Sequence, residues 1–318
     1  MSNAFRNRRD LLEFCEIDNS HSIFDLDGGF PLRVTRYYAS LIEKGNAQDP
    51  LLLQVLPQVC EAEESQGYST DPVGDVAAMV VPGLIHKYPS RVLLTLTAAC
   101  AIHCRYCFRR HFPYSEAVAD PGPDGAIMQY LQQHHDINEV ILSGGDPLVV
   151  SDEPIARLVH QLNRLRHIKI LRIHSRLASV LPERITDDLL QLLQSFHGQV
   201  VWVTHINHPN EISPHNQQAF QRIRDHGQAL FNQSVLLKGI NDNVENLAAL
   251  SYRLFESSIT PYYLHRLDKV QGSQHFALTD TESCRLYRDL KKLLPGYLLP
   301  RLVDEIAGHL SKTAVHCD

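Results

Sequence analysis

The sequence has little that would mark a membrane or secreted protein. It contains no run of about 18 apolar residues, and its start, MSNAFRNRRD, lacks the apolar core of a signal peptide. Acidic residues only slightly outnumber basic ones, 36 against 30, and no long block of one charge occurs. A broad surface for nucleic acid or anionic membranes is therefore not expected. Seven cysteines, three of them close together, do not fit a disulfide framework, so we expect a cytoplasmic protein without nucleic-acid or membrane partners.

Short apolar or β-branched runs predict six strands, at 91–97, 138–143, 168–175, 199–206, 228–237 and 260–267. From the second onward they start about 30 residues apart, which leaves room for a helix and two loops between strands. Repeated βα units imply parallel strands with right-handed crossovers, and these are fewer than a closed barrel needs. We therefore expect an α/β fold, either a partial (β/α)6 TIM-like barrel or a doubly wound sheet.

The region before this series, residues 1–90, is predicted to be a mostly helical N-terminal extension. In the stretch RVTRYYASLIEKG, helical spacing places Val34, Tyr38, Leu41 and Ile42 on one face. Further along the chain, Thr279-x-x-Glu282 and Asp242-x-x-Glu245 resemble capping boxes, and they predict helix starts at both places.

Residues with reactive or charged side chains follow each predicted strand. Because the carboxyl ends of parallel strands lie at one edge of a sheet or barrel, these residues are expected to form one shared site. The stretches, in chain order, are 100–110, GGDP at 144–147, HSR at 174–176, HINHPNE at 205–211, KGIND at 238–242 and HRLDKVQG at 265–272.

The stretch after the first strand holds three cysteines, Cys100, Cys104 and Cys107, at the spacing Cys-x3-Cys-x2-Cys. A cubane iron–sulfur cluster has four irons, so three thiolates leave one iron open to a small molecule. A zinc site completed by His103 or His111 is the alternative, because structural zinc needs four ligands. Tyr106 before the third thiol and the position after a first strand favour the cluster.

These residues resemble the motif of the radical S-adenosylmethionine enzymes, which have an aromatic residue before the last cysteine and a partial (β/α)6 barrel. SGGDPL is similar to their methionine-binding turn, and this implies that Gly144, Gly145 and Asp146 face the amino group of S-adenosylmethionine. Within that superfamily the chain most resembles the lysine 2,3-aminomutases, especially the branch that serves β-lysylation of elongation factor P. The matching stretches lie within 71–313: CRYCFRRHFPY, SGGDPL, RIHSR, HINHPNE, NQSVLLKGIND, PYYLHRLDKVQG and SKT.

The resemblance implies a radical SAM partial barrel at 91–294 and a C-terminal segment at 295–318 that carries the lysine for pyridoxal 5′-phosphate. It implies a [4Fe–4S] cluster on the three cysteines and a Schiff base between pyridoxal phosphate and Lys312. Phosphate-binding positions correspond to Lys87, Arg176 and Gln233. Further cofactor-binding positions correspond to Tyr106, His205 and Asn207.

Substrate recognition is implied in the same way. The forked guanidinium of Arg109 suits a carboxylate. Asp268 and Glu305 correspond to the two acids that bind the ε-ammonium of lysine, although the second is usually Asp. Two acids in one pocket favour lysine over glutamate, whose side chain they would repel.

The implied function is that of an isomerase. A 5′-deoxyadenosyl radical removes hydrogen from C3 of L-lysine, nitrogen moves from C2 to C3, and the β-lysine supplies the modification of elongation factor P by its lysyl-transferring ligase. Flavodoxin or ferredoxin would be the electron donor. A free-lysine or glutamate aminomutase, a radical enzyme without pyridoxal, and a zinc-stabilised binding protein are the alternatives.

Two departures from the free-lysine enzymes concern zinc. Asn243 stands where a zinc-ligating cysteine is expected, and Cys317 alone does not replace their C-terminal cysteine cluster. We therefore do not expect that zinc site. The remaining cysteines, Cys15, Cys60 and Cys284, are expected to be ordinary thiols.

Overall fold

A computed structural model of the chain describes residues 3–18, 29–119, 122 and 125–317. Its centre is a ten-stranded sheet whose spatial order follows the sequence from β1 to β10. Every neighbouring pair from β3 to β9 is parallel. These strands are β3 (Arg91–Thr95), β4 (Glu139–Ser143), β5 (Ile170–His174), β6 (Gln199–Thr204), β7 (Ala229–Val235), β8 (Thr260–His265) and β9 (Arg301–Asp304).

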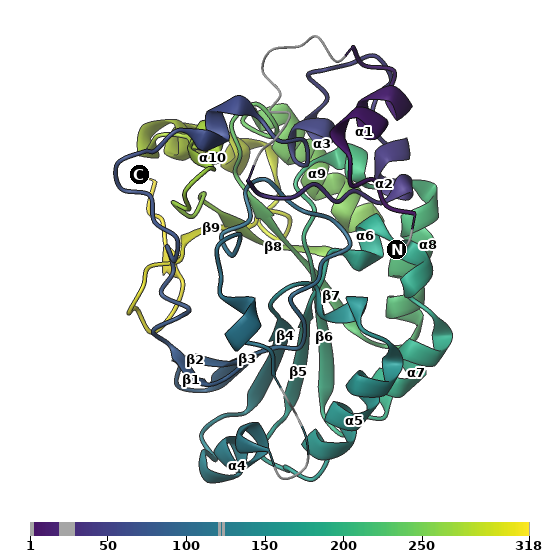
Figure 1. The fold of residues 1–318 in the computed structure, drawn as a ribbon, viewed down its shortest axis with the longest axis vertical. Helices are drawn as coiled ribbons and strands as arrows, with labels where there is room; N and C mark the ends of the chain where they lie inside the picture. Colours follow the sequence, from purple (N-terminus) through teal and green to yellow (C-terminus); the bar gives the residue numbers. More distant parts are fainter. Residues whose placement is uncertain (1–2, 19–28, 120–121, 123–124, 318) are drawn as a thin grey trace.

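The strand order decides between the two expected architectures. A doubly wound sheet reverses its strand order at a switch point, whereas a barrel keeps neighbours in sequence order, as this sheet does. The outer strands β1 and β10 do not pair with each other, so the barrel is open on one side. The prediction of a partial TIM-like barrel, with its six strands, is confirmed (Figure 1).

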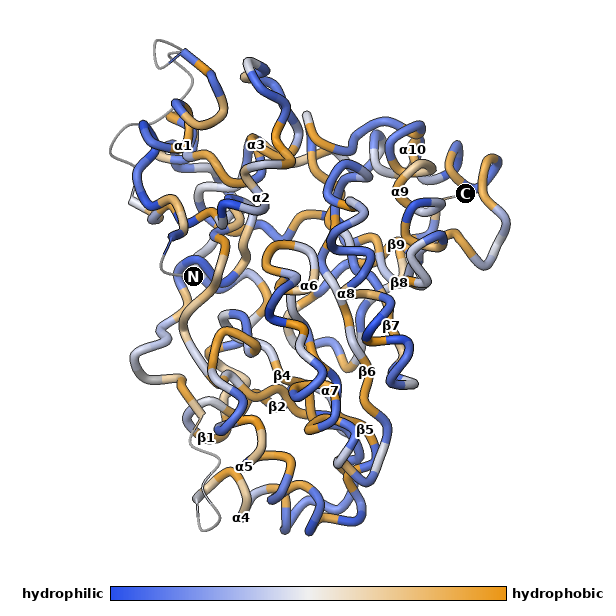
Figure 2. Tube along the Cα trace, turned by 90° about the vertical axis from the view of Figure 1, so that its right-hand side faces the viewer, coloured by the Kyte–Doolittle hydropathy of each residue, from blue (hydrophilic) through white to orange (hydrophobic). Residues whose placement is uncertain are grey.

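Helices alternate with the parallel strands and cover their outer face (Figure 1). Along α5 and α7 hydrophobic and hydrophilic residues alternate, as expected of helices with one buried face (Figure 2). No helix in the described part of the chain is long and apolar enough to cross a bilayer. The helices are α4 (Ala126–Gln133), α5 (Asp152–Leu162), α6 (Leu177–Val180), α7 (Asp187–Gln194), α8 (Pro214–Asp225), α9 (Val244–Glu256) and α10 (Asp280–Leu293), with 3-10 turns at Tyr114–Glu116, Pro147–Val149, Pro182–Arg184, Pro209–Glu211 and Gln274–Phe276.

The helix starts follow local side-chain chemistry. At α10 the predicted capping box is present, since Thr279 and Glu282 bond each other's backbone amides. At α9 the cap is Asn243, which accepts from the amide of Asn246, so the prediction of a box starting at Asp242 is wrong by one residue. Asn243 thus has a structural role at the position where a zinc ligand was considered.

The N-terminal region is less helical than predicted. It has three short helices, α1 (Arg8–Phe14), α2 (Arg36–Ser40) and α3 (Pro50–Leu53), a 3-10 turn at Val59–Ala62, and two strands, β1 (Met79–Val81) and β2 (Leu84–Tyr88). The prediction is therefore wrong for residues 79–88, which pair antiparallel beside β3. Pro82 and Gly83 form the turn between β1 and β2. Gly83 has a φ of +79°, and its backbone lies so close to Ala119 that a Cβ would not fit.

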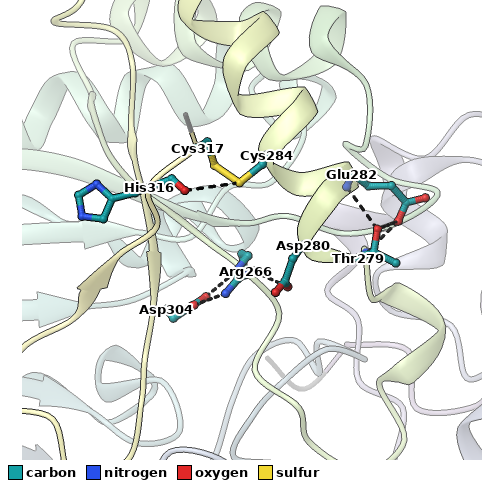
Figure 3. The surroundings of a disulfide bond; sticks show 8 residues. All are labelled: Arg266, Thr279, Asp280, Glu282, Cys284, Asp304, His316 and Cys317. Carbon is teal, nitrogen blue, oxygen red and sulfur yellow. Dashed lines mark hydrogen bonds and ion pairs between the residues drawn. A yellow bond between two sulfur atoms is a disulfide. The ribbon is translucent and has the colours of Figure 1, made fainter.

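The expectation that Cys284 is an ordinary thiol is also wrong. Cys284 in α10 forms a disulfide with Cys317, 33 residues further along, beyond the two-residue strand β10 (Thr313–Ala314) (Figure 3). Cys15 and Cys60 are free thiols, as expected. Spacing in the sequence gave no sign of the pair, because the chain between them forms the rest of α10, β9 and a loop before it returns.

Candidate active site

A cavity of about 500 Å³ lies inside the barrel, and its lining side chains range along the chain from Val73 to Lys312. All but one of the predicted site residues line this cavity. The exception is Asn207, which is buried behind Tyr106. The lining members are Lys87, Cys100, Cys104, Tyr106, Cys107, Arg109, Gly144, Gly145, Asp146, Arg176, His205, Gln233, Asp268, Glu305 and Lys312.

The three cysteines lie together in the loop after β3. Burial, followed by the neighbouring thiol of Cys104, raises the pKa of Cys107 to about 11. Burial raises the pKa of Cys100 well above its ordinary value as well. Such thiols need a cationic group beside them to ionise, and a metal cluster supplies that charge.

The single-zinc alternative needs His103 or His111 as a fourth ligand. The His111 ring contacts the carbonyl of Gln271. His103 stacks on Phe30, and its ring contacts the carbonyl of Pro31. A cubane cluster gives each thiolate its own iron, so the thiols need not meet at one point.

The N-terminal region supports the cysteine loop from behind. Arg33 donates to the carbonyl of Cys100 at 2.8 Å. Glu61 pairs with Arg105 and, at 2.8 Å, with Arg110 on either side of Cys107. Burial opposes ionisation of Glu61, but the two arginines outweigh it and lower its pKa. The N-terminal extension therefore fixes the loop, a role that the sequence did not indicate.

The glycine-rich turn after β4 packs against the same loop. A Cβ at Gly145 would lie 2.4 Å from the carbonyl oxygen of Ala99, so only glycine allows this approach. The Asp146 carboxylate accepts from Ser175 at 2.7 Å and from the amide of Arg176 at 2.8 Å. Burial raises the pKa of Asp146 to about 6, although these hydrogen bonds act to lower it. The turn thus ties the ends of β3, β4 and β5 together at the cavity.

Arg176 belongs to a buried polar network beside the cysteines. Its guanidinium lies 2.6 Å from the carboxylate of Glu211 and 2.8 Å from the sulfur of Cys104. The Tyr106 hydroxyl joins this network, because Arg176 donates to it at 2.9 Å and Asn207 at 2.6 Å. Glu211, the last residue of HINHPNE, was not predicted as a site residue. Its place in HINHPNE, one of the stretches that resemble the family, could have indicated it.

A second set of ion pairs in the same cavity includes Lys312. Asp75 pairs with Arg109 at 2.6 Å and with Lys87 at 2.5 Å. Glu305 lies 3.3 Å from Lys87 and also pairs with Lys312. Burial opposes ionisation of Glu305, but Lys312 and Lys87 lower its pKa to about 2. Asp75 was missed in the sequence, since nothing in DPVGD distinguishes it from a turn residue.

Burial shifts the pKa values of other titratable groups in the cavity toward their neutral forms. Burial lowers the pKa of His205 to about 3, and its ring lies 2.6 Å from the amide nitrogen of Gln233. Burial, with Glu305 nearby, raises the pKa of Asp268 to about 7. The Nε2 atoms of His174 and His265 are buried without a hydrogen-bond partner among the described residues. Such atoms call for a polar ligand in the cavity.

Comparison with known proteins identifies the family. Residues 94–250 match the Radical SAM superfamily. The L-lysine 2,3-aminomutase of Haemophilus influenzae is 48% identical over 284 residues, covering 89% of this chain and 84% of that protein. This chain belongs to the lysine 2,3-aminomutase family. The Escherichia coli L-lysine 2,3-aminomutase is 47% identical, with 89% and 83% covered, and that of Clostridium subterminale is 37% identical, with 89% and 68% covered.

Among solved structures, native anSMEcpe with bound AdoMet aligns at a TM-score of 0.45 and 12% identity, over 63% of this chain and 59% of that one.

Membership of the Radical SAM superfamily implies a [4Fe–4S] cluster and S-adenosylmethionine. The residues of this aminomutase-family chain fit both groups. The three cysteines and the GGD turn line the same cavity, and two buried ring nitrogens in its wall, on His174 and His265, have no hydrogen-bond partner within the described part of the chain.

Proposed function

We propose that the protein converts L-lysine to β-lysine by 2,3-amino migration, using pyridoxal phosphate in addition to the cluster and S-adenosylmethionine. One observation carries the proposal: Lys312 lies in the same cavity as the cysteine triplet. Lys87 and Asp268 line that cavity too. The cavity with the cysteine triplet therefore also contains an amine for the cofactor (Lys312), a cation for its phosphate (Lys87) and an acid for the substrate (Asp268).

When bound, the cluster and S-adenosylmethionine supply a 5′-deoxyadenosyl radical, and pyridoxal phosphate supplies the carbonyl group that binds the migrating nitrogen. Cys100, Cys104 and Cys107 would hold the cluster in the wall of the cavity. Gly144 and Gly145 pack closely on Thr95 and Ala99, and this would place their turn beside the cluster, where S-adenosylmethionine would bind. Arg176 donates to the sulfur of Cys104 and to the Tyr106 hydroxyl beside it.

Lys312 has the surroundings of a cofactor-binding amine. Glu305 pairs with its Nζ and with Lys87, so the two cations share one carboxylate. A phosphate bound at Lys87 with Gln233 would compete for that cation and free Glu305 for other partners. Neutral His205 next to Gln233 offers a donor or acceptor without adding charge.

Substrate choice follows from the acids and Arg109. Asp268 and Glu305 give the cavity two carboxylates that suit the ε-ammonium of lysine and repel the side chain of glutamate. Arg109 faces the same cavity and binds the substrate carboxylate, with Asp75 fixing its orientation. The extra methylene of Glu305, compared with the family's Asp, allows it to reach Lys87, and this fits a branch with its own stereochemistry or affinity.

The proposal extends to the setting of the reaction. The resemblance to the branch serving elongation factor P, together with Asn243 at the expected zinc-ligand position, supports β-lysine as a precursor for that factor's ligase. The protein would then act in the cytoplasm with flavodoxin or ferredoxin as reductant. The domain boundaries, with the barrel at 91–294 and the lysine-bearing segment at 295–318, belong to the same proposal.

The test is an anaerobic assay with reconstituted cluster, a chemical reductant, S-adenosylmethionine, pyridoxal phosphate and L-lysine. Chromatography with mass detection is expected to show β-lysine, and Lys312→Ala is expected to abolish it while leaving the iron content unchanged. Lys238→Ala, outside the cavity, is the matched control. Turnover by Lys312→Ala equal to that of the control would contradict the pyridoxal assignment, and conversion of L-glutamate but not L-lysine would favour the glutamate enzyme.

A further inference from the structure

The segment that carries Lys312, residues 305–317, has few attachments to the barrel. Residues 306–311 are exposed. Their hydrogen bonds in the described part of the chain are local, from the amide of His309 to Ile306 and between the His309 ring and Thr313. The position of Lys312 therefore depends on Glu305 before this stretch and on the residues that follow Lys312.

Three attachments follow Lys312. Thr313 and Ala314 of β10 pair with β9, and the amide of Val315 donates to Leu302 at 3.0 Å. The third is the Cys284–Cys317 disulfide, which joins the end of the segment to α10 (Figure 3). A two-residue strand adds little stability alone, so the disulfide makes a large contribution to holding the segment.

Helix α10 is a firm anchor for that bond. Arg266, directly after β8, pairs with Asp280 at the start of α10 and with Asp304 at the end of β9 (Figure 3). Leu286 and Leu290 of α10 belong to a buried cluster against which Cys317 packs. A bond to Cys284 therefore fixes the segment to a part of the molecule that is itself joined to the cavity strands.

We propose that Cys284 and Cys317 form a reversible dithiol–disulfide site that sets how firmly Lys312 is held in the cavity. The inference rests on the proposed function, in which Lys312 binds pyridoxal phosphate. Cytoplasmic disulfides are usually transient, and both cysteines are only half-buried, outside the fully buried core. Their Cα atoms lie 5.0 Å apart, a spacing at which the bond can form and break without backbone movement.

The exchange is balanced with a low-molecular-weight disulfide as oxidant. One cysteine thiolate attacks that disulfide and releases one thiol, and the second cysteine then attacks the mixed disulfide and releases the other. Cys284 and Cys317 together lose two electrons and two protons, and the small disulfide becomes two thiols. A small dithiol reverses the reaction and is itself oxidised. In the oxidised protein the segment stays fixed, and in the reduced protein it moves away from the cavity more often.

The test is amide hydrogen exchange by mass spectrometry on the full-length protein, kept anaerobic in buffers of reduced and oxidised glutathione. We expect exchange at residues 313–317 to be at least about tenfold faster in the reduced state. Cys317→Ser and Cys284→Ser should exchange fast in both buffers. Cys60→Ser, which removes an unrelated half-buried thiol, should behave like the unmodified protein.

Equal exchange in the two states, with the oxidation state verified by mass, would overturn the inference, as would a pair that stays reduced at every glutathione ratio. Borohydride labelling of Lys312 by pyridoxal phosphate separates this inference from the proposed function. Redox-dependent exchange without any labelling would support the disulfide site and contradict the pyridoxal assignment. Labelling of Lys312 together with equal exchange in the two redox states would support the pyridoxal assignment and contradict the disulfide site.

Discussion

The ammonium of Lys87 lies 3.3 Å from the carboxylate of Glu305, and this pair links β2 to the segment after β9. Strands β2 and β9 are far apart in the strand order, and the sheet has open edges at β1 and β10. Tyr88 adds a hydrogen bond to the same carboxylate at 3.1 Å. The open side of the barrel is therefore bridged by side chains, and Figure 1 shows the C-terminal segment running beside the chain that leads to β1.

The bridge predicts a specific acid sensitivity. The pKa of Glu305 is lowered from 4.5 to about 2, so its stabilising effect is complete above about pH 5 and is lost as the pH falls toward 2. A shift of this size corresponds to on the order of 3 kcal/mol. Urea denaturation from pH 7 to pH 3 should show a flatter pH dependence for Glu305→Gln than for the unmodified protein. The exposed Glu153→Gln is the control, and parallel curves for all three proteins would contradict the prediction.

Asp268 predicts a pH dependence of catalysis. Its pKa is raised to about 7, so it is mostly protonated below that pH and binds an ammonium poorly there. We expect kcat/KM for L-lysine to rise with pH up to about 7, and Asp268→Asn to lower it by about 10- to 100-fold and remove this rise. Steady-state kinetics across pH 5.5–8.5 would check this. A similar rise in Asp268→Asn would assign the titration to another group.

The buried pair of Arg176 and Glu211 predicts a large loss of stability on truncation. Both side chains are less than a tenth exposed, so Glu211→Ala leaves the Arg176 guanidinium buried without its carboxylate. The expected loss is about 3–5 kcal/mol in the free energy of unfolding, measured by denaturant titration. Glu256→Ala removes a surface partner of Arg253 and should change that free energy by less than about 0.5 kcal/mol. Equal effects of the two substitutions would contradict the importance of the buried network.

The close approach at Gly145 predicts a defect in cluster binding. Gly145→Ala would place a Cβ 2.4 Å from Ala99 and displace the loop that begins at Cys100. The iron content after anaerobic reconstitution should fall to less than about half of normal. Gly296→Ala, with nothing near its Cβ, should retain the full iron content. Full iron binding by Gly145→Ala would show that the turn does not position the cysteine loop.

The sequence predicted the fold where periodicity is strong and failed where elements are short. The six predicted strands have clear apolar runs, whereas β9 has four residues and β10 has two, and they exist because neighbouring strands supply partners. The hairpin of β1 and β2 was missed because its strands have only three and five residues.

Within the site, the sequence indicated candidate residues for the chemistry but not the partners that hold them in place. Asp75 meets Arg109 across 34 residues, and Lys87 meets Glu305 across 218. Cys284 and Cys317 meet across 33. Such contacts depend on how the chain folds back, and no local pattern of spacing or charge specifies them. The resemblance to a family supplied the candidate positions, and the structure adds the residues that contact and orient them.

The central claim is that Lys312 binds pyridoxal phosphate in the cavity that holds the cysteine triplet. The most direct measurement is borohydride reduction of the reconstituted protein, followed by peptide mass spectrometry to locate the pyridoxyl group. We predict that the modification lies on Lys312 and disappears in Lys312→Ala. Modification spread over exposed lysines such as Lys292, with Lys312 unmodified, would contradict the claim.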